Sequence, residues 1–540
     1  METPITSRVQ PSPVSPVPAN AFGSATSKIA ADGFTFDDVL LLPRRSDVLP
    51  ASASTKTRLT NSIDLNIPLI SAPMDTVTES GLAIALAQEG GIGFIHKNLP
   101  IEDQAREVAK VKRSANGVIT DPITLGPNDT VGRARDLMRK HRVSGFPVTE
   151  DGSGDVRSPE GPAGKLMGIL TSRDLKFVVA ETTPVSEVMT AEKLITAPPT
   201  TTLAEAEIIL NKNKVEKLLL VDGDFRLCGL ITMRDIERLA SFPNALVDDR
   251  GRLRCGAAIG PGHYERLEAL IAAGADVIVV DTAHGHSENV LRTVAETKKR
   301  YDVQLVAGNI ATIEGARDLA LAGADAVKVG IGPGSICTTR VVTGVGVPQI
   351  SAVMNAAEGV RLAATQKAPG AVPVPVIADG GVRQSGDIAK ALAAGADTVM
   401  MGSLFAGLDE SPGELVISGG RRYKAYRGMG SEGAMSAGSA DRYRQSAADG
   451  KPEHTKFVPE GVEGLVPYRG SLAEYVFQLV GGIRSAMGYC GCPTIADLRS
   501  DAQFSRVSAA TVVENHPHDI RITKESPNYS VDSAPGTSRR

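Results

Sequence analysis

The sequence predicts an α/β protein, a (β/α)8 TIM barrel into which a separate, internally repeated module is inserted. Three observations support this prediction. Eight short apolar runs alternate with helix-like segments, which is typical of parallel strands covered by helices. Three of these runs follow the same phrase, Ala-Gly-Ala-Asp, in which glycine ends a helix and leads directly into a strand. Between the second and third runs the alternation of strand-like and helix-like segments stops, and a segment follows whose two halves are similar in sequence.

Length and composition exclude several classes of protein. A chain of 540 residues can hold two or three domains, and a hydrophobic content of 42% suffices for a full core. The net charge of −4, with no dominant basic face, argues against specific nucleic-acid binding. No apolar run reaches the ~18 residues that a membrane span needs, and the N-terminus lacks an apolar signal core. We therefore expect a cytoplasmic protein with neither membrane nor nucleic-acid partners.

The five cysteines form no recognisable framework. Their odd number in a large chain favours a reducing compartment over disulfide bonds. The only close pair, Cys490 and Cys492, lacks a second pair or histidines at zinc spacing, so we expect it to be structural.

The first part of the barrel is expected at residues 34–115, after a tail that is predicted to be disordered. Residues 1–33 are rich in Pro, Ser, Ala and Thr, and they cannot bury enough apolar surface to offset the entropy of ordering. The first two strands are predicted at residues 67–72 and 92–95, with a helix between them.

The inserted module is expected at residues 116–242, with similar halves at 116–180 and 181–242. Its clearest repeat is the pattern Gly-apolar-apolar-Thr-x-Arg-Asp, at Gly168–Leu175 and again at Gly229–Ile236. Two copies of one supersecondary unit form a separate module. An exposed loop of a barrel accepts such an insertion at little cost.

This repeated pattern resembles a tandem pair of cystathionine-β-synthase (CBS) domains. The resemblance implies a regulatory module that binds a purine nucleotide, ATP or GTP, between its halves. Asp174 and Asp235 match the aspartate that contacts ribose in that family. Each could instead only cap the helix that it begins. The motif fixes neither which nucleotide binds nor whether binding activates or inhibits.

The second part of the barrel is expected at residues 243–505. Six strands complete the count of eight, at residues 253–259, 277–280, 304–307, 326–329, 374–378 and 398–401. Residues 409–470 have an irregular pattern rich in glycine and charge, which predicts a mobile flap because structureless loops of this length are usually lids or disordered. Residues 506–540 form a C-terminal segment.

In a barrel of this type the working face lies at the carboxyl ends of the strands. Gly380-Gly381 and Gly402-Ser403 follow the last two strands, where backbone N–H groups and a helix N-terminus would hold a phosphate. Asp379 could accept from a ribose hydroxyl pair there, or it could be an ordinary turn residue. His284 and His286 share a loop but lack a third ligand, so a ligand contact or a plain polar loop is preferred to a metal site.

The residues after the sixth strand, Gly332–Arg340, place a single cysteine in a glycine-rich loop. Such a loop can expose backbone N–H and C=O groups to a ligand or ion. A thiol beside Thr339 and Arg340 could be activated as a nucleophile. Taken alone, the stretch more often belongs to a surface loop with an inert cysteine. Its position on the working face, beside a predicted phosphate site, makes Cys337 the better candidate nucleophile.

Residues 34–530 resemble the inosine 5′-monophosphate (IMP) dehydrogenase family, and in particular its bacterial members. Beyond the tandem insertion, the matching motifs are Ser71–Glu79, Gly332–Arg340, Ala378–Gly381, Tyr426–Ser431 and Arg442–Tyr443. The resemblance implies the oxidation of IMP to xanthosine 5′-monophosphate (XMP) by NAD+ and water, which is the first committed step of guanine nucleotide synthesis.

The resemblance also implies roles for individual residues. Cys337 would attack carbon 2 of the purine and form a covalent thioimidate. Thr339 would assist the water step, with Arg442 as general base and Tyr443 beside it, although the free pKa of arginine lies above ~12. The residues that match IMP contacts are Ser335, Asp379, Gly381, Gly402, Ser403, Tyr426, Gly428, Gly430 and Glu460. The residues that match the NAD+ side are Asp281, Asn309 and Gly330.

A potassium ion and an oligomer are implied as well. Backbone carbonyls of the cysteine loop match a K+ site, which a neighbouring subunit completes with carbonyls of its C-terminal segment. The residues concerned are Gly332, Gly334 and Cys337 of the loop, and Glu514, Asn515 and His516 of the C-terminal segment. This arrangement implies a homotetramer or an octamer.

Two other functions stay open on the sequence alone. Guanosine 5′-monophosphate (GMP) reductase is similar around the cysteine loop and runs related hydride chemistry, but it normally lacks the tandem insertion and the Arg-Tyr flap. The alternative from another class is a catalytically silent nucleotide sensor, in which the CBS pair is the function and the barrel a scaffold. An intact Cys337, Arg442 and Tyr443 argue against it.

Overall fold

A computed structural model describes residues 32–114, 119, 122–141, 143–152, 164–443, 445 and 457–529. The side chains at 235 and 238–240 also lie outside the described part, so the structure does not test the prediction for Asp235. The same holds for the tail predicted to be disordered, except for its last two residues.

Eight parallel strands form a closed barrel, which confirms the predicted fold class. Around the barrel they are β11 (Gly256–Ile259), β12 (Val277–Asp281), β13 (Gln304–Ile310), β14 (Ala326–Val329), β15 (Val376–Asp379), β16 (Thr398–Met401), β4 (Leu69–Ser71) and β5 (Ile92–Ile95). Nearly all of their residues are buried, because one face fills the barrel interior and the other packs against helices.

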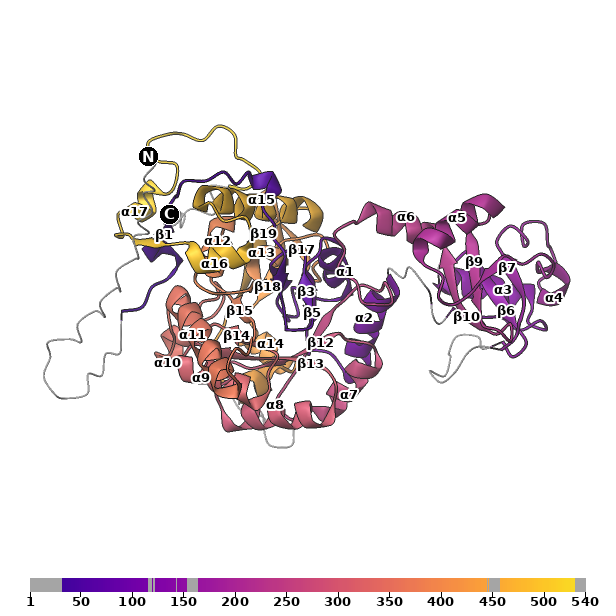
Figure 1. Ribbon diagram of the computed structural model, residues 1–540, viewed down its shortest axis with the longest axis horizontal. Coiled ribbons are helices and arrows are strands. Elements are labelled where there is room, and N and C mark those ends of the chain that lie inside the picture. Colours follow the sequence, from indigo (N-terminus) through magenta and orange to yellow (C-terminus); the bar gives the residue numbers. More distant parts are fainter. Residues whose placement is uncertain are drawn as a thin grey trace, which may run out of the picture. The chain divides into compact units, whose positions relative to one another are not determined.

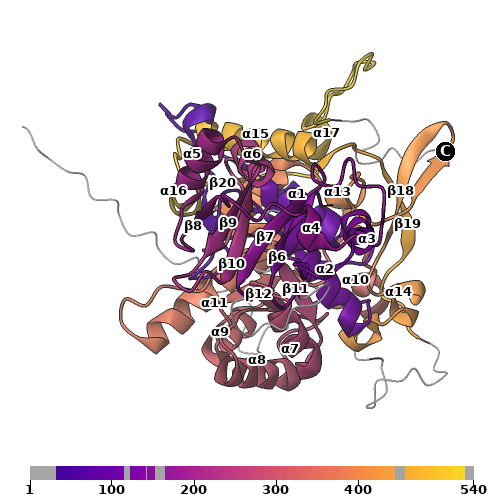
Figure 2. The same ribbon diagram turned by 90° about the vertical axis from the view of Figure 1, so that its right-hand side faces the viewer.

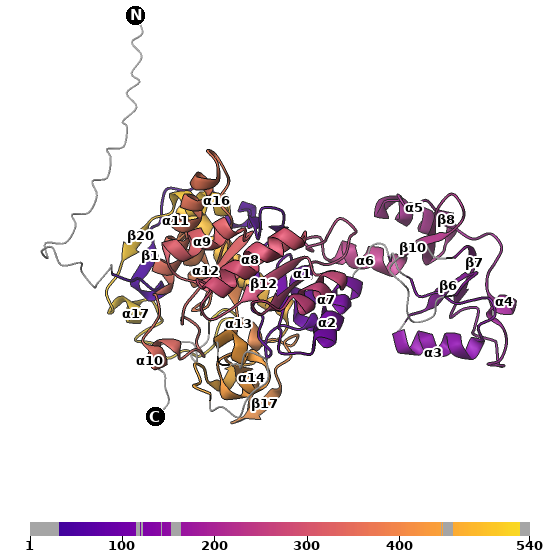
Figure 3. The same cartoon turned by 90° about the horizontal axis from the view of Figure 1, so that it is seen from below.

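Helices surround this barrel, as Figures 1 and 3 show. The larger ones are α1 (Ser80–Gln88), α2 (Ile101–Ser114), α7 (Tyr264–Ala272), α8 (Glu288–Arg300), α9 (Ile313–Ala322), α11 (Gln349–Lys367), α12 (Ser385–Ala393) and α15 (Leu472–Cys490). Their apolar sides join the outer faces of the strands in one large core cluster.

The Ala-Gly-Ala-Asp phrase has a physical reason in the structure. Its glycines end helices with positive φ, which is 112° at Gly323. Each of its aspartates then accepts a hydrogen bond from a backbone N–H near the start of the preceding barrel strand. The pairs are Asp276 with Cys255 N at 2.9 Å, Asp325 with Leu305 N at 2.7 Å, and Asp397 with Val376 N at 2.9 Å. The phrase therefore fastens neighbouring strands at the amino end of the barrel.

Several strand boundaries differ from the prediction. β4 and β11 are shorter than the apolar runs 67–72 and 253–259. In the other direction, β12 ends in Asp281, β13 continues through Asn309 to Ile310, and β15 ends in Asp379. The strand ladder includes Asp281 and Asp379, and it shifts register at Asn309, between Gly308 and Ile310. These polar residues therefore belong to the strands and not to loops as predicted.

The repeated segment folds as helix–strand–strand twice. The first copy contains α3 (Val131–His141), β6 (Gly145–Thr149) and β7 (Leu166–Thr171), and the second contains α5 (Leu203–Asn213), β9 (Lys217–Val221) and β10 (Leu227–Thr232). Both strand pairs are antiparallel, and each copy has its own apolar cluster. Three short elements complete the segment: α4 (Val185–Val188), β8 (Thr196–Ala197) and α6 (Met233–Ser241).

The flap region, predicted to be irregular, contains a three-stranded antiparallel sheet. Its strands are β17 (Leu415–Ser418), β18 (Arg421–Arg427) and β19 (Glu463–Pro467), of which Figure 2 labels β18 and β19. Gly419 and Gly420 join β17 to β18 with φ of 57° and 75°, the backbone that a tight two-residue hairpin needs. The short helices α14 (Glu432–Ser436) and η3 (Ser439–Tyr443) follow, and residues 444 and 446–456 lie outside the described part.

The remaining elements are short and lie near the chain ends or in the loops of the barrel. β1 (Val39–Leu41) pairs with β20 (Phe504–Arg506), which joins the start of the described chain to its C-terminal segment. The others are η1 (Phe36–Asp38), η2 (Pro50–Ser52), β2 (Thr57–Arg58), β3 (Asp64–Leu65), α10 (Thr339–Thr343), α13 (Ser403–Ala406), α16 (Ile495–Asp501) and α17 (Thr511–Glu514). Among the described residues, no helix has the length and apolar character that crossing a membrane requires.

Candidate active site

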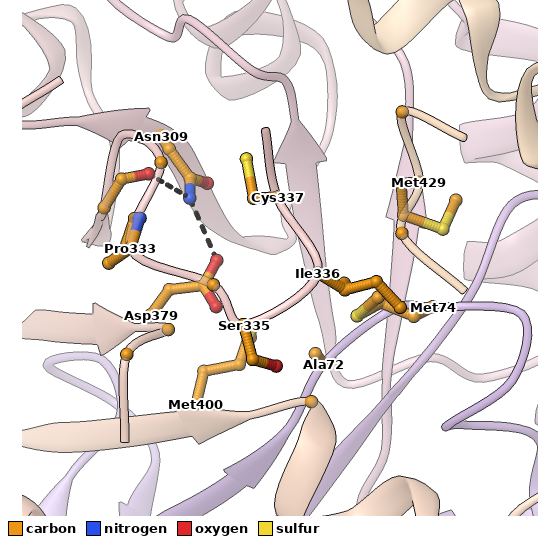
Figure 4. A pocket seen from close by; sticks show the side chains of 18 of the residues that line it. Ala72, Met74, Asn309, Pro333, Ser335, Ile336, Cys337, Asp379, Met400 and Met429 are labelled. Carbon is orange, nitrogen blue, oxygen red and sulfur yellow. Dashed lines mark hydrogen bonds between the residues drawn. The ribbon is translucent and has the colours of Figure 1, made fainter. Parts of the chain in front are cut away.

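One pocket opens at the carboxyl ends of the barrel strands, and the flap forms part of its wall. It brings together most of the residues predicted for the site. Those on its lining are Asp281, Asn309, Gly330, Gly332, Gly334, Ser335, Cys337, Thr339, Asp379, Gly381, Gly402, Ser403, Tyr426, Gly428, Gly430, Arg442, Tyr443 and Glu460. Figure 4 shows Ser335, Cys337, Asn309 and Asp379 around this opening.

The Cys337 thiol lies in the loop between β14 and α10 and is half-buried. Its Sγ donates to Thr339 Oγ1 at 3.2 Å, and Thr339 Oγ1 donates to Glu460 Oε2 at 2.8 Å. Backbone bonds join the same two segments, since Thr338 N donates to the Glu460 carbonyl at 2.9 Å and Val462 N to the Ile336 carbonyl at 3.1 Å. The second half of the flap is therefore bound to the cysteine loop by both side-chain and backbone hydrogen bonds.

A buried lysine that the sequence pattern did not single out connects the polar groups of the pocket. Lys328 lies within β14, and its side chain is only 1% exposed. Its ammonium donates to Asp281 Oδ1 and to Asp379 Oδ2, each at 2.8 Å, and also to Asn309 Oδ1. Asn309 Nδ2 in turn donates to Asp379 Oδ2 at 2.9 Å and to the Gly330 carbonyl at 2.8 Å, the two bonds dashed in Figure 4.

The flap places a second cation in the same network. Arg442 forms an ion pair through Nη1 with Asp281 Oδ2, and its backbone carbonyl accepts from Ala283 N at 3.1 Å. Asp281 thus uses one oxygen for Lys328 and the other for Arg442. The charges alternate from the flap to Asp379, which stabilises each of them in a buried setting.

Two tyrosines close the pocket on the flap side. Tyr443 packs against the backbone at Gly430, where a Cβ would lie 2.8 Å from the phenol ring. Burial raises the pKa of Tyr443, partly opposed by the nearby Arg442 charge. Burial also raises the pKa of Tyr426, which the hydroxyl of Ser335 opposes by a hydrogen bond. Both phenols therefore stay protonated at neutral pH and can act as hydrogen-bond donors.

The predicted phosphate loops have a backbone suited to their role. Gly380 and Gly381 have φ of 92° and 82°, in the left-handed region where a side chain would be strained. Gly402 precedes the short helix α13, and a Cβ there would lie 2.9 Å from the Tyr426 hydroxyl. These glycines let backbone N–H groups approach a ligand closely.

The other predicted residues lie elsewhere. The carboxylate of Asp174 accepts from Thr171 N and Oγ1, each at 2.7 Å, within a turn that follows β7. No helix begins at Asp174, so it is not the helix cap that the simpler interpretation expected. His286 pairs with Asp318 at 3.1 Å. No group of three or more His, Cys, Asp or Glu side chains suited to a metal occurs within the described residues.

The three C-terminal residues predicted for K+ are outside the pocket lining. Glu514 is the last residue of α17, with Asn515 and His516 directly after it. The His516 carbonyl oxygen lies 3.0 Å from His518 Nδ1. On the loop side, the Gly334 carbonyl accepts from Cys337 N at 3.1 Å, which closes a tight turn.

Comparisons with known proteins point to one family. The family described as "IMP dehydrogenase / GMP reductase domain" matches residues 33–518. The chain is 57% identical over 515 residues to inosine-5′-monophosphate dehydrogenase from Rhodopirellula baltica, covering 95% of this chain and 91% of that protein. It is 53% identical over 508 residues to the enzyme of the same name from Bacillus subtilis, covering 94% and 99%.

A solved structure bears on the rival activity. A GMP reductase from Trypanosoma brucei, in complex with guanosine 5′-monophosphate, matches with a TM-score of 0.80 and 38% identity, covering 92% of this chain and 99% of that chain. What remains uncovered is shorter than the tandem module, so part of the module has a counterpart there. The expected difference in the module therefore does not extend to this GMP reductase. With this pocket and these matches, the chain belongs to the IMP dehydrogenase / GMP reductase family.

Proposed function

We propose that this enzyme oxidises IMP to XMP with NAD+, through a covalent intermediate on Cys337. The observation that carries the proposal is the position of this thiol, which lies in one pocket with the phosphate-type glycine loops, Asp379 and the flap residues Arg442 and Tyr443. Relatives at 53–57% identity over most of the chain bear the name inosine-5′-monophosphate dehydrogenase. The reaction would supply guanine nucleotide synthesis.

The pocket lining suits a purine nucleotide. The N–H groups around Gly381, Gly402 and Ser403 would hold the phosphate. Asp379 uses Oδ2 for Lys328 and Asn309, so its other oxygen can accept from the ribose. Ser335 and Tyr426 supply hydroxyl groups to the nucleotide. Gly428, Gly430 and Glu460 belong to the flap side of the same wall, against the purine.

The chemistry requires two steps. Cys337 loses its proton and forms a bond to carbon 2 of the purine, and a hydride leaves that carbon with its electron pair for NAD+. Water then adds to carbon 2, the carbon–sulfur bond breaks, XMP leaves and the thiol recovers its proton. Thr339 would assist the water, a role that its hydrogen bonds to Cys337 Sγ and Glu460 support.

The residues predicted for the dinucleotide fit it only when the flap has moved. Asp281, Asn309 and Gly330 lie together on the pocket wall, where Asp281 could accept from a ribose hydroxyl. In this structure Arg442 occupies the Asp281 oxygen that faces the flap. NAD+ supplies the hydride acceptor when bound, and Arg442 with Tyr443 would take its place for the hydrolysis, as general base and neighbour.

A cation and an assembly complete the proposal. K+ would be held by carbonyls of Gly332, Gly334 and Cys337, and by those of Glu514, Asn515 and His516 from a neighbouring subunit. This requires an oligomer, which we propose is a homotetramer or an octamer. ATP or GTP would bind the CBS pair at residues 116–242. One titration of activity and particle mass against K+ and each nucleotide tests all of these points.

The nucleophile is tested by Cys337→Ala, with Cys228→Ser in the inserted module as the matched control. We expect Cys337→Ala to lower turnover at least about 1,000-fold and to leave IMP binding, measured by calorimetry, within about 3-fold. The control should keep its turnover. Normal NADH production by Cys337→Ala would refute the covalent step. Activity only with GMP and NADPH would instead assign the GMP reductase reaction.

A further inference from the structure

A second buried lysine lies beside the pocket and contacts the flap. Lys97 follows β5 by two residues, and its side chain is 4% exposed. Its ammonium forms an ion pair with Asp441 Oδ1, in the residue directly before Arg442. The two partners are 344 residues apart in sequence, so the pair joins the rim of the barrel to the flap.

This pair is the main charge contact of Asp441. The other carboxylate oxygen, Oδ2, is buried and has no hydrogen-bond partner among the described residues. His263 Nε2 lies 3.9 Å from it, but burial lowers the pKa of His263 and keeps that ring neutral. Arg266 is the other nearby cation, and its Nη1 donates to Gln104 Oε1 at 2.7 Å. Lys97 is therefore the cation that holds Asp441.

Lys97 depends on Asp441 in turn, because the carboxylate stabilises its buried charge. Burial lowers the pKa of Lys97, and the Asp441 carboxylate opposes that shift, while Arg442 and Arg266 reinforce it. If the flap moved away, the Lys97 ammonium would lose its counter-ion, while Arg266, which lies outside the flap, would remain a positive neighbour. An unpaired buried charge is costly, so the ion pair favours the docked flap.

The barrel rim leaves space for the Asp441 carboxylate beside a glycine. Gly260 follows β11, and a Cβ at this position would collide with Asp441 Oδ2. The missing side chain thus leaves the space that the carboxylate fills. β5, β11 and β12 are hydrogen-bonded neighbours in the barrel, so the seats of Asp441 and Arg442 adjoin.

Two consecutive flap residues of opposite charge thus meet two rim residues of opposite charge. Asp441 meets Lys97, and Arg442 meets Asp281. A shift of the flap by one residue would bring like charges together, which electrostatic repulsion disfavours. The pairing therefore fixes the register in which the flap docks.

From this geometry we propose that Lys97 is a positioning residue, which seats Asp441 and thereby sets Arg442 and Tyr443 against the covalent intermediate. The proposal rests on the role in hydrolysis proposed above for Arg442. Lys97 would act on the water step alone, because hydride transfer takes place with the flap displaced from Asp281.

The test compares Lys97→Met, Asp441→Asn and the double variant in rapid-mixing experiments that follow NADH. We expect the first-turnover burst of NADH to keep its rate within about 3-fold, and the steady-state rate to fall about 10- to 100-fold, the size of loss that misplacing a catalytic group causes. The steady-state rate of the double variant should be no lower than that of the slower single variant, because both changes break the same ion pair. Lys110→Met, in which the lysine pairs with Glu107 and is 55% exposed, is the matched control.

The outcomes separate the two proposals. Equal losses of burst and steady-state rate, or additive losses in the double variant, would overturn the positioning role of Lys97. So would an unchanged steady-state rate in Lys97→Met while Arg442→Ala slows hydrolysis, a result that leaves the proposed function standing. An unchanged ratio of burst to steady-state rate in Arg442→Ala would instead refute the role of the flap arginine itself.

Discussion

Strand β12 has a lysine-centred charge cluster at each of its ends. At the amino end, just before the strand, Asp276 pairs with Lys112 at 2.9 Å, and Lys112 also binds Asp248 at 3.0 Å. At the carboxyl end, Asp281 pairs with Lys328 at 2.8 Å. Both lysine side chains are almost fully buried, with exposed fractions of 4% and 1%.

The two clusters differ in what surrounds the carboxylates. At the amino end, Asp276 accepts from Cys255 N, and Asp248 accepts from the backbone and guanidinium of Arg252. These partners belong to the base of the barrel. At the carboxyl end, Asp281 lines the pocket and binds a flap residue, so its partner can be exchanged for a ligand. A buried lysine is thus no sign of catalysis by itself, and the exchangeable partner makes the difference.

The strongest test of this comparison replaces each lysine by methionine. Both Lys328→Met and Lys112→Met leave buried carboxylates without their cation, and each should lower the free energy of unfolding by about 3–5 kcal/mol. Only Lys328→Met should also lower kcat/KM, by at least about 100-fold for the folded enzyme, since Asp281, Asn309 and Asp379 lose their common donor.

Urea unfolding followed by circular dichroism, together with steady-state kinetics at a temperature where both variants are folded, measures the two effects separately. A loss of kcat/KM in Lys112→Met as large as in Lys328→Met would break the distinction between the clusters. So would full activity in Lys328→Met.

A second and smaller contrast concerns the reactivity of two cysteines, one beside the amino-end cluster and one in the pocket at the carboxyl ends of the strands. Cys255 lies next to the amino-end cluster, fully buried, and burial raises the pKa of its thiol. Cys337 lines the pocket. Iodoacetamide should therefore alkylate Cys337 at least about 10-fold faster than Cys255 in the folded enzyme, and IMP should protect Cys337.

Peptide mass spectrometry over a time course gives both rates. Cys490 and Cys492 are also buried, and burial raises the pKa of both thiols, so they serve as internal controls for unfolding. Comparable labelling of Cys337 and Cys255 while the control thiols stay unmodified would mean that pocket access does not set reactivity.

Much of this architecture could be predicted from the sequence because local rules act repeatedly. Most barrel-strand residues are apolar, and the Ala-Gly-Ala-Asp phrase marks three helix-to-strand junctions. The flap sheet was predictable too, since Gly419 and Gly420 stand between two segments of strand-like residues, but the glycine and charge around them favoured a loop prediction. The composition of the whole region outweighed its local turn signal.

The lysines of the site could not be predicted in this way. Lys328 lies between two valines in an apolar strand, and its partners Asp281 and Asp379 are 47 and 51 residues away. Lys97 and Asp441 are farther apart still. Ion pairs between distant segments leave no periodic pattern in the chain, and they become visible only when the barrel closes and brings its strand ends together.

The smallest expected effect is the change with pH in the contribution of Asp276 to the free energy of unfolding. Burial raises the pKa of Asp276 above its ordinary value of 3.8, more than Lys112 lowers it. The folded state therefore holds this proton at a pH where the unfolded state has released it. As pH rises above 3.8 and passes the folded pKa, the contribution of Asp276 to stability falls, and it then stays constant. The free energy of unfolding of the wild type, minus that of Asp276→Asn, should thus decrease across this window. If the difference rose instead, Lys112 would more than offset the cost of burying the carboxylate, and the amino-end cluster would be a source of stability and not only a buried charge held in place.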